Sequence, residues 1–376
     1  MLVPVPYRVR HLLLLSLLAA FCVESALGDF LDGLSSTLTN LTPLQCAKQL
    51  LTTSLEAGAK KLLSKIIPKV KPKEAVSEYT SVFKDIVATY KPVDAGNIVD
   101  KEQLLRYATF AGASYCEQGV VEKLQGLQLG PDHMRMLWDD ANIANWHSSP
   151  GTNYFIAVSS SAKTVTVSFR GTRDKRDIVS FMDGAPVPPS ETLFPGASAS
   201  DMVFRGMQES ASRLIPSVLT ELKNQLDAHP DYQVVVTGHS LGGTYAKLFG
   251  LHLVLTQPQV KLAAVYTYAE LASGMVTFSS WAARRIGLDR YVRVTMRNDI
   301  VPRLFQGKDG KYGHSEVGIE IYFPRADSTE MRRCDEISDN QCHSGVPCKD
   351  LSWDAHSRLG GFQMTDTTCV LPDAER

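Results

Sequence analysis

Hydrophobic residues follow two repeating patterns in the part of the chain beyond residue 100. Short runs rich in β-branched and aromatic residues alternate with longer segments in which apolar residues recur at helical spacing. The short runs predict strands and the longer segments predict helices. The predicted strands are 153–158, 164–172, 234–237, 262–267, 291–295 and 318–323, and the predicted helices are 101–116, 207–226, 241–255 and 278–286. This alternation predicts an α/β domain with a largely parallel sheet over residues 100–376.

The part of the chain before residue 100 has a different pattern. A basic start precedes an apolar run from Leu12 to Val23, and the small residues Ala26 and Gly28 follow. This arrangement predicts a secretory signal peptide over residues 1–28, because the run is shorter than the ~20 residues that a membrane-spanning helix needs. Residues 29–99 have apolar residues at helical spacing and a linker containing prolines and lysines. They predict a helical extension packed on the following domain, with a propeptide or a lipid-facing arm as the alternative.

The segment 232–244 has the pattern of a nucleophile elbow, in which a serine stands on a sharp turn between a strand and a helix. Three valines precede the turn, Gly238 and Gly242 flank Ser240, and the pattern of a buried helix follows at once. Glycine permits the strained turn, which lifts the serine hydroxyl above the sheet. Ser240 is therefore the predicted nucleophile, with an ordinary glycine turn as the alternative. The backbone N–H of Leu241 is the predicted first oxyanion donor.

A serine nucleophile of this kind needs a histidine base and a carboxylate that orients it, in the chain order serine, acid, histidine. Asp299 stands just past the end of the predicted strand 291–295, and a proline closes its loop. It is the predicted acid, because a carboxylate in that place can accept a hydrogen bond from the base. An aspartate after a strand is also commonly a loop or capping residue. The competing carboxylates are Glu270, Asp289 and Asp309.

Three histidines follow Asp299 and compete for the role of base. His356 stands in a late loop, after the last predicted strand, from which an imidazole can reach over Ser240. His314 stands directly before the strand 318–323, and His343 lies beside a cysteine in an expected disulfide loop, so each can have a structural role. Order along the chain gives His356 only a small advantage over His314.

The second oxyanion donor is expected at the end of the predicted strand 164–172, where a glycine lets the backbone approach the nucleophile. The Thr172 N–H is the candidate, and a plain strand-ending turn is the alternative. Beyond it, Ile178, Phe181 and Met182 share one face of a short predicted helix with a charged start. This amphipathic segment predicts a lid that turns toward lipid, and a surface helix with its apolar side buried is the alternative.

Composition narrows the class of function. The formal net charge of −1 gives no reason to expect a nucleic acid partner. Seven cysteines are present and Cys22 would leave with the signal peptide, so the remaining six predict disulfides in a secreted chain. No paired Cys-x-x-Cys or His-x-x-x-His spacing occurs, so no metal site is predicted. Asn40 begins an Asn-Leu-Thr sequon and is a candidate glycosylation site.

Four motifs resemble those of the fungal-type class 3 lipases, a family of the α/β-hydrolase superfamily. Residues 167–172 look like the oxyanion strand of that family, and Gly-His-Ser-Leu-Gly-Gly at 238–243 matches its elbow. Residues 298–302 are similar to its acid motif. Residues 312–322 resemble its next strand, where the family also carries a histidine that is not the base. Together these motifs are specific, and the resemblance covers about residues 100–370.

The resemblance implies an α/β-hydrolase fold with a largely parallel central sheet, to which the N-terminal helical extension is added. It implies that His356, which stands in an Asp-x-His segment, is the base. It also implies the disulfides Cys116–Cys369 and Cys334–Cys342, which by elimination would leave Cys46 to pair with Cys348. The chain departs from the family at 269–274, which lacks the usual Gly-x-Pro-Arg-Val-Gly-like turn, and at Ile178, where many members carry a lid tryptophan.

The residues and the resemblance together predict a secreted serine carboxylic-ester hydrolase, and specifically a triacylglycerol lipase. Its expected partner is an acylglycerol or other lipid ester at a lipid–water interface, and no metal or organic cofactor is implied. A phospholipase or a feruloyl-type esterase on the same fold is the alternative within this chemistry. A non-catalytic secreted lipase-like binding protein is the alternative from another class, which the intact set of serine, aspartate and histidine disfavours.

Overall fold

The computed structural model describes much of the chain between residues 99 and 364. The described residues are 99–125, 140–149, 152–172, 183–303, 319–325, 330–334, 341–347, 350–359 and 362–364. Several expectations lie outside them. These are the signal peptide, the extension to residue 98, Asn40, the lid residues Ile178, Phe181 and Met182, the alternatives Asp309 and His314, and Cys46, Cys348 and Cys369.

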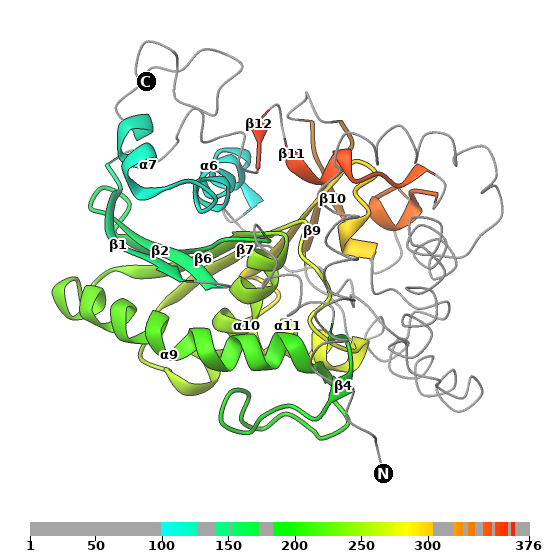
Figure 1. The fold of residues 1–376 in the computed structure, drawn as a ribbon, viewed down its shortest axis with the longest axis horizontal. Coiled ribbons are helices and arrows are strands. Elements are labelled where there is room, and N and C mark those ends of the chain that lie inside the picture. Colours follow the sequence, from blue (N-terminus) through cyan, green and yellow to red (C-terminus); the bar gives the residue numbers. More distant parts are fainter. Residues whose placement is uncertain are drawn as a thin grey trace, which may run out of the picture.

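An eight-stranded sheet forms the centre of the described structure (Figure 1). In spatial order its strands are β1 (Asn142–Ser149), β2 (Thr152–Ser159), β3 (Thr164–Phe169), β6 (Gln233–His239), β7 (Leu262–Tyr268), β8 (Tyr291–Met296), β9 (Ile319–Phe323) and β10 (Arg332–Cys334). Strands β3, β6, β7, β8 and β9 are parallel, whereas β1, β2 and β10 pair antiparallel at the two sides. The expected α/β class with a largely parallel sheet is confirmed.

Helices cover both faces of this sheet. Helices α6 (Lys101–Ala113) and α7 (Gln118–Gln125) lie on one face, and α9 (Arg205–Ala228), α10 (Leu241–Thr256) and α11 (Val276–Ile286) lie on the other (Figure 1). Successive side chains of a strand point to opposite faces. In β6, Val234 and Val236 therefore join the core under α9 to α11, whereas Val235 joins the core under α6. Because both faces are covered, the interior strands read as nearly continuous apolar runs.

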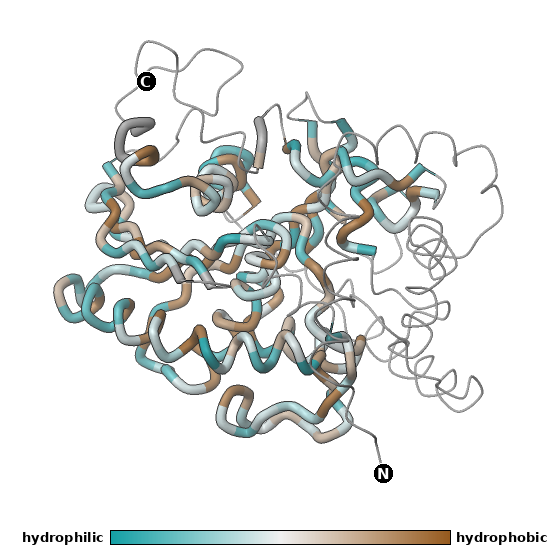
Figure 2. The backbone as a smooth tube through the Cα atoms, in the orientation of Figure 1, coloured by the Kyte–Doolittle hydropathy of each residue, from teal (hydrophilic) through white to brown (hydrophobic). Residues whose placement is uncertain are grey.

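Hydropathy follows the depth of each element. Residues 241–253 of α10 are all buried, whereas α9 buries one stripe that includes Met207, Leu214, Val218 and Leu222. In Figure 2 the turns of α9 accordingly alternate between hydrophobic and hydrophilic positions. Among the described residues, no helix is both long enough and apolar enough to cross a membrane.

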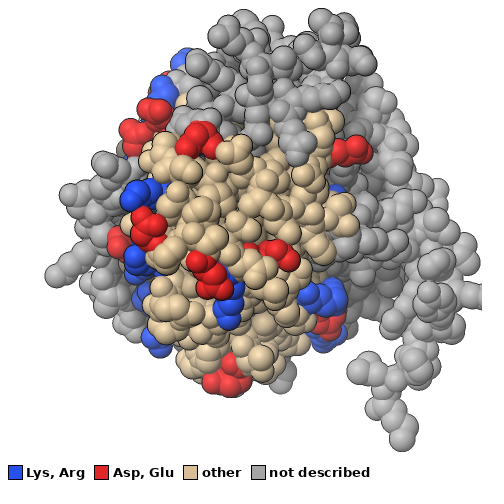
Figure 3. Space-filling model, turned by 90° about the vertical axis from the view of Figure 1, so that its left-hand side faces the viewer, with Lys and Arg blue, Asp and Glu red and all other residues tan. Residues whose placement is uncertain are grey.

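Charges of both signs are mixed on the surface. On the face shown in Figure 3, Lys and Arg side chains lie close to Asp and Glu side chains, and neither sign forms a large continuous patch among the described residues. Exposed ion pairs such as Lys163–Asp231, 2.9 Å apart, follow the same pattern. This mixture of charges on the described surface agrees with the formal net charge of −1.

Interior strands match the sequence expectations more closely than the edges do. Strands β6, β7 and β8 begin and end close to their predicted limits, but the strand expected over 164–172 ends at Phe169. The helix expected over 101–116 ends at Ala113. Strands β1 and β10 were not predicted, because an edge strand needs no apolar run: β1 reads Asn-Ile-Ala-Asn-Trp-His-Ser-Ser.

Short elements complete the described structure. They are the strands β4 (Pro186–Val187), β5 (Val203–Phe204), β11 (Arg358–Leu359) and β12 (Phe362–Gln363), and the 3₁₀ turns η3 (Val301–Arg303), η4 (His343–Gly345) and η6 (Asp354–Ser357). The three turns follow β8 in the sequence. They carry or adjoin the residues expected to complete the catalytic site.

Candidate active site

The turn at Ser240 is a strained connection between β6 and α10. Ser240 has φ 59° and ψ −129°, a conformation that residues with a side chain rarely adopt. Its N–H donates to the carbonyl of Tyr268 at 2.8 Å, which holds the turn against β7. A Cβ on Gly238 would lie 2.2 Å from the carbonyl oxygen of Gly242, and a Cβ on Gly242 would lie 2.2 Å from that of Phe169. Only glycine therefore fits on either side of the serine.

Ser240, His356 and Asp299 lie in one hydrogen-bonded row. His356 Nε2 is 2.8 Å from Ser240 Oγ, and His356 Nδ1 is 2.8 Å from Asp299 Oδ2. The serine follows β6, the aspartate follows β8, and the histidine belongs to η6. The Asp299 side chain is fully buried, whereas the His356 side chain is 15% exposed. The row therefore runs from a water-excluded carboxylate to an imidazole that solvent can reach.

The hydrogen bonds indicate which atoms carry the protons. An ionised carboxylate only accepts, so His356 Nδ1 donates to Asp299 and His356 Nε2 is left to accept the hydroxyl proton of Ser240. The second carboxylate oxygen of Asp299, Oδ1, accepts the N–H of Val301 at 2.9 Å. This arrangement is the one in which a histidine can remove a proton from a serine.

Backbone hydrogen bonds join the loop that carries His356 to the loop that carries Asp299. The Ile300 N–H donates to the Ser352 carbonyl at 3.2 Å, and the Ser352 N–H donates to the Asn298 carbonyl at 2.8 Å. The Asn298 side chain also donates to the backbone carbonyl of Asp350, 52 residues later. Loops far apart in the sequence are thereby held together at the site.

His239, directly before the nucleophile, supports the loop of His356 and was missed by the sequence reasoning. Its Nε2 is 2.8 Å from the backbone oxygen of His356, and its Nδ1 is 2.9 Å from the hydroxyl of Tyr115. A carbonyl only accepts, so Nε2 donates and Nδ1 accepts from the hydroxyl. Burial, together with the charge of His356, lowers the pKa of His239 well below its ordinary value, which keeps this ring neutral. The histidine of the elbow motif was the available sequence signal.

The two expected oxyanion donors adjoin the same turn. Strands β3 and β6 are parallel with Phe169 opposite Gly238, so the loop that reaches Thr172 runs beside the elbow. The approach is close, because a Cβ on Gly171 would lie 2.6 Å from the backbone oxygen of His239. Leu241 is the first residue of α10, and the first N–H groups of a helix have no partner within the helix. Both positions suit a donor aimed at the serine.

The other acids and histidines of the described structure have different partners. Glu270 is buried and accepts a hydrogen bond from the Tyr291 hydroxyl. Asp289 lies at the surface, where it pairs with Arg290 at 3.6 Å. His343 is buried behind the acid, and its Nε2 is 2.7 Å from the backbone oxygen of Asp299 rather than near Ser240. None of the three stands in the row that includes the serine.

The disulfide expected between Cys334 and Cys342 is present, with Cα atoms 6.4 Å apart. Cys116 is also disulfide-bonded, and its partner lies outside the described residues. Within the described part of the chain, no group of three or more His, Cys, Asp or Glu side chains is placed to hold a metal ion.

A cavity of about 430 Å³ lies away from the serine. Its lining includes Thr164 and Gln233, which begin β3 and β6, and Arg106 and Gln103 of α6. Because Ser240 follows the other end of β6, this cavity belongs to the opposite edge of the sheet.

Comparison with known proteins relates the chain to lipases. A family model for class 3 lipases matches residues 166–308, a range that holds Thr172, Ser240 and Asp299. The lipase of Rhizopus niveus is 26% identical over 298 residues, which cover 75% of this chain and 70% of that lipase. A secreted alkaline triacylglycerol lipase of Penicillium cyclopium is 26% identical over 197 residues, covering 52% of this chain and 66% of that protein.

Solved structures share the fold. The lipase of Rhizopus microsporus var. chinensis matches with a TM-score of 0.58 at 25% identity, covering 73% of this chain and 91% of that chain. A triacylglycerol lipase described as having a serine protease triad as its catalytic centre matches with a TM-score of 0.57 at 25% identity, covering 71% of this chain and 96% of that chain. The expected α/β-hydrolase fold is thereby confirmed.

Proposed function

Because the chain belongs to the fungal-type class 3 lipase family of the α/β-hydrolase superfamily, we propose that it hydrolyses acylglycerol esters with Ser240, His356 and Asp299 as its catalytic triad. The observation that carries this proposal is the row of two 2.8 Å hydrogen bonds that joins the three side chains. Carboxylic ester hydrolysis is the activity of the family, and the residue roles are inferred from the geometry.

In the first half of the reaction Ser240 Oγ attacks the ester carbonyl while His356 Nε2 takes its proton. Asp299 holds the imidazole through Nδ1 and stabilises the imidazolium that forms. The negative charge that develops on the carbonyl oxygen is stabilised by the N–H groups of Leu241 and Thr172. The ester C–O bond then breaks, and the departing alcohol takes the proton from His356, leaving an acyl-enzyme on Ser240.

In the second half a water molecule repeats the sequence. His356 Nε2 removes a proton from the water as it attacks the acyl carbonyl, and the same two N–H groups stabilise the second oxyanion. Collapse of this intermediate breaks the bond to Ser240 Oγ, which recovers its proton from His356, and the free fatty acid leaves. The proton that Ser240 lost to the alcohol is thereby replaced by one from water, so Ser240 and His356 return to their starting protonation states and the proposed cycle uses no metal and no organic cofactor.

A fluorophosphonate probe tests the nucleophile directly. We expect a covalent adduct on Ser240 of the wild-type protein and none on the Ser240→Ala variant. Ser212 is exposed on α9, so Ser212→Ala is a matched control that should retain both labelling and ester hydrolysis. Absence of an adduct on the wild-type protein would contradict the proposal and favour a non-catalytic lipase-like binding protein.

Separate variants test the base. We expect His356→Ala to lose ester hydrolysis and His314→Ala to retain it. The reverse result would transfer the role of base to His314.

A substrate panel tests the substrate class. We expect emulsified triglyceride to be hydrolysed faster than phospholipid or soluble short-chain esters, as the named activity of the relatives suggests. If Ile178, Phe181 and Met182 line a lid, the rate should also rise sharply when the substrate exceeds its solubility limit. Faster hydrolysis of phospholipid, or of feruloyl esters, would replace the triglyceride proposal, and a smooth saturation curve would count against the lid.

A further inference from the structure

His343 contacts the backbone of the loop that carries Asp299, which spans residues 297–300 between β8 and η3 and is called the acid loop below. It begins η4, directly after the disulfide of Cys342, and only 2% of the residue is exposed. Its Nε2 lies 2.7 Å from the backbone oxygen of Asp299. Because that oxygen can only accept, Nε2 carries the hydrogen and donates it. The contact joins two residues 44 positions apart, on different loops.

This hydrogen bond completes the set of partners of Asp299. The Asp299 N–H donates to the Met296 carbonyl at 2.9 Å, Oδ1 accepts from the Val301 N–H, and Oδ2 accepts from His356. The backbone oxygen is the remaining polar atom, and it is fully buried, where an oxygen without a donor would be costly. His343 supplies that donor from a segment 44 residues later in the chain.

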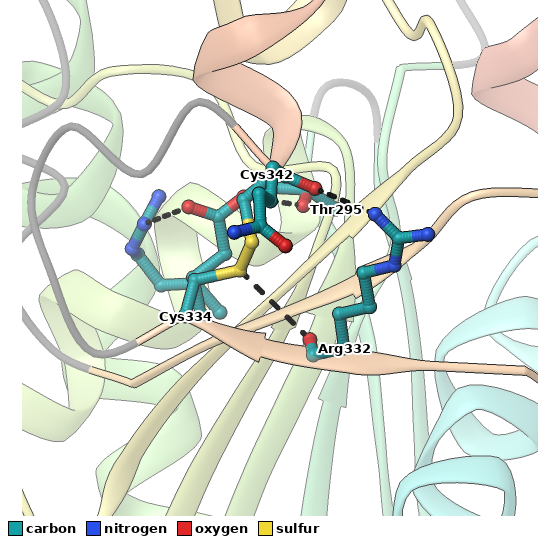
Figure 4. Close-up of a disulfide and its surroundings, with 7 residues drawn as sticks. Thr295, Arg332, Cys334 and Cys342 are labelled. Atoms are coloured by element: carbon teal, nitrogen blue, oxygen red, sulfur yellow. Dashed lines mark hydrogen bonds and ion pairs between the residues drawn. A yellow bond between two sulfur atoms is a disulfide. The ribbon is translucent and has the colours of Figure 1, made fainter.

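The turn that carries His343 is itself held in place. Cys342 is tied by its disulfide to Cys334 at the end of β10, beside Thr295 of β8 (Figure 4). Arg303 of η3 also contacts this turn, since its Nη1 donates to the backbone oxygen of His343 at 3.1 Å. The contacts are therefore reciprocal. The Arg303 side chain, next to the acid loop, binds the backbone of η4, and the His343 side chain of η4 binds the backbone of the acid loop. Such a pair of contacts fixes the distance between the two segments.

The surroundings of His343 favour a neutral donor. Burial lowers the pKa of His343, and Arg303 lowers it further, while Glu320 of β9 and Asp299 act in the opposite direction. Glu320 is engaged by Arg293 Nη2 at 3.2 Å and by Thr295 Oγ1 at 2.7 Å. The imidazole ring also packs near Tyr322 of β9, with ring centroids 6.3 Å apart. His343 therefore sits in one orientation with one hydrogen to donate.

We propose that His343 is a positioning residue for the catalytic acid, which holds the backbone of Asp299 so that its carboxylate meets His356. This inference rests on the proposed triad. His343 touches no reacting atom in this arrangement, and its effect passes through Asp299 to His356. A small displacement of the acid loop would loosen the hold on the base, and misplacement of a catalytic group by ~1 Å can cost ~10²-fold in rate.

Three substitutions separate this role from simple core packing. His343→Gln retains an amide nitrogen at about the reach of Nε2, whereas His343→Asn has the same chemistry but is too short to reach the carbonyl. His343→Leu removes the donor altogether. Each variant is assayed with a soluble short-chain ester, and kcat is expressed per site titrated by the fluorophosphonate, so that misfolded protein does not count.

We expect kcat per titrated site to fall by roughly 10-fold or more in His343→Asn and His343→Leu, with KM within about 2-fold of the wild type. His343→Gln should return kcat to within about 3-fold of the wild type. If His343→Leu fails to fold, the difference in kcat between His343→Asn and His343→Gln still tests the proposal. Wild-type kcat in His343→Asn, or equal losses in Asn and Gln, would overturn the proposal. A wild-type protein that neither hydrolyses esters nor takes the probe would instead contradict the triad.

Discussion

At the scale of single residues, the three imidazoles that contact the triad or its backbone have different roles because their hydrogen-bond partners differ. His356 donates through Nδ1 to a carboxylate and keeps Nε2 for the serine. His239 and His343 each donate through Nε2 to a backbone carbonyl, of His356 and Asp299 respectively. Burial lowers the pKa of both, so neither should compete for the proton that His356 carries. The identity of the base is therefore set by hydrogen-bond partners rather than by residue type.

Neutralising the acid tests this assignment at the same scale. We expect Asp299→Asn to reduce kcat by roughly 10⁴-fold, because an amide favours the wrong tautomer of the base and cannot stabilise the imidazolium. Asp289→Asn is the matched control, since Asp289 is a half-exposed surface residue paired with Arg290. Steady-state hydrolysis of a soluble ester measures both variants. A loss in Asp289→Asn with full activity in Asp299→Asn would reverse the assignment.

At the scale of elements, the site depends on how tightly α10 packs against β3 and β6. Helix α10 begins directly after the turn at Ser240. Its second residue, Gly242, lies against the backbone of Phe169 in β3. This close approach brings the loop of Thr172 and the first amide of α10 to the same place. The expected oxyanion site therefore depends on the close packing of α10 against β3 and β6, and this packing requires glycine at 238 and 242.

A pair of glycine substitutions tests this packing. We expect Gly242→Ala to lower the free energy of unfolding by roughly 1–3 kcal/mol or more, because its Cβ would lie 2.2 Å from the Phe169 carbonyl oxygen. In α7, a Cβ on Gly119 would meet nothing within 4 Å. Gly119→Ala should therefore be neutral or stabilising by up to about 1 kcal/mol. Denaturant unfolding of both variants decides, and equal stability of the two would contradict the packing argument.

At the scale of the whole molecule, the core contains charges as well as apolar side chains. Lys247 of α10 is 1% exposed and lies 5.7 Å from the centre of the Tyr291 ring. Arg293 and Glu320 form a buried pair at 3.2 Å between β8 and β9. Buried charges cost desolvation energy unless they are paired. Because burial lowers the pKa of Lys247, the stability of this fold should depend on pH through Lys247.

The pKa of Lys247 determines whether the free energy of unfolding rises or falls with pH. Burial lowers its pKa from 10.5 to about 8, although Glu270 opposes the shift. Between these values the unfolded chain binds more protons than the folded chain, so the contribution of Lys247 to the free energy of unfolding rises with pH. From pH 7.5 to pH 10.5, the wild type should gain on the order of 3 kcal/mol relative to Lys247→Met.

Denaturant unfolding at several pH values in that range measures this gain. Lys223→Met, at an exposed position of α9, is the control and should show no such trend. A difference between wild type and Lys247→Met that stayed constant with pH would show that Lys247 does not titrate in this way.

The N-terminal segment gives a second prediction for the whole molecule. If residues 1–28 are a signal peptide, the secreted protein should begin at Asp29 or within a few residues of it. N-terminal sequencing of protein recovered from the medium of a secreting host checks this. A chain that begins at Met1 would contradict secretion through a cleaved signal.

The sequence by itself determined the features that depend on neighbours along the chain. The interior strands, the helices between them, the elbow at Ser240 and the position of Asp299 after β8 all follow from local periodicity or from glycines at short spacing. Strand β1 was not predicted, because an edge strand needs no apolar pattern of its own.

Only the tertiary structure decided the features that depend on loops docking across the chain. Order along the chain barely separated the histidines, yet folding places His356 beside Ser240 and His343 behind Asp299. The elbow motif contains His239, but no pattern along the chain indicated that His239, Tyr115 and Asn298 support the loops of the site. The physical reason is that these contacts join loops without periodicity, and their partners are backbone carbonyls, which every residue possesses.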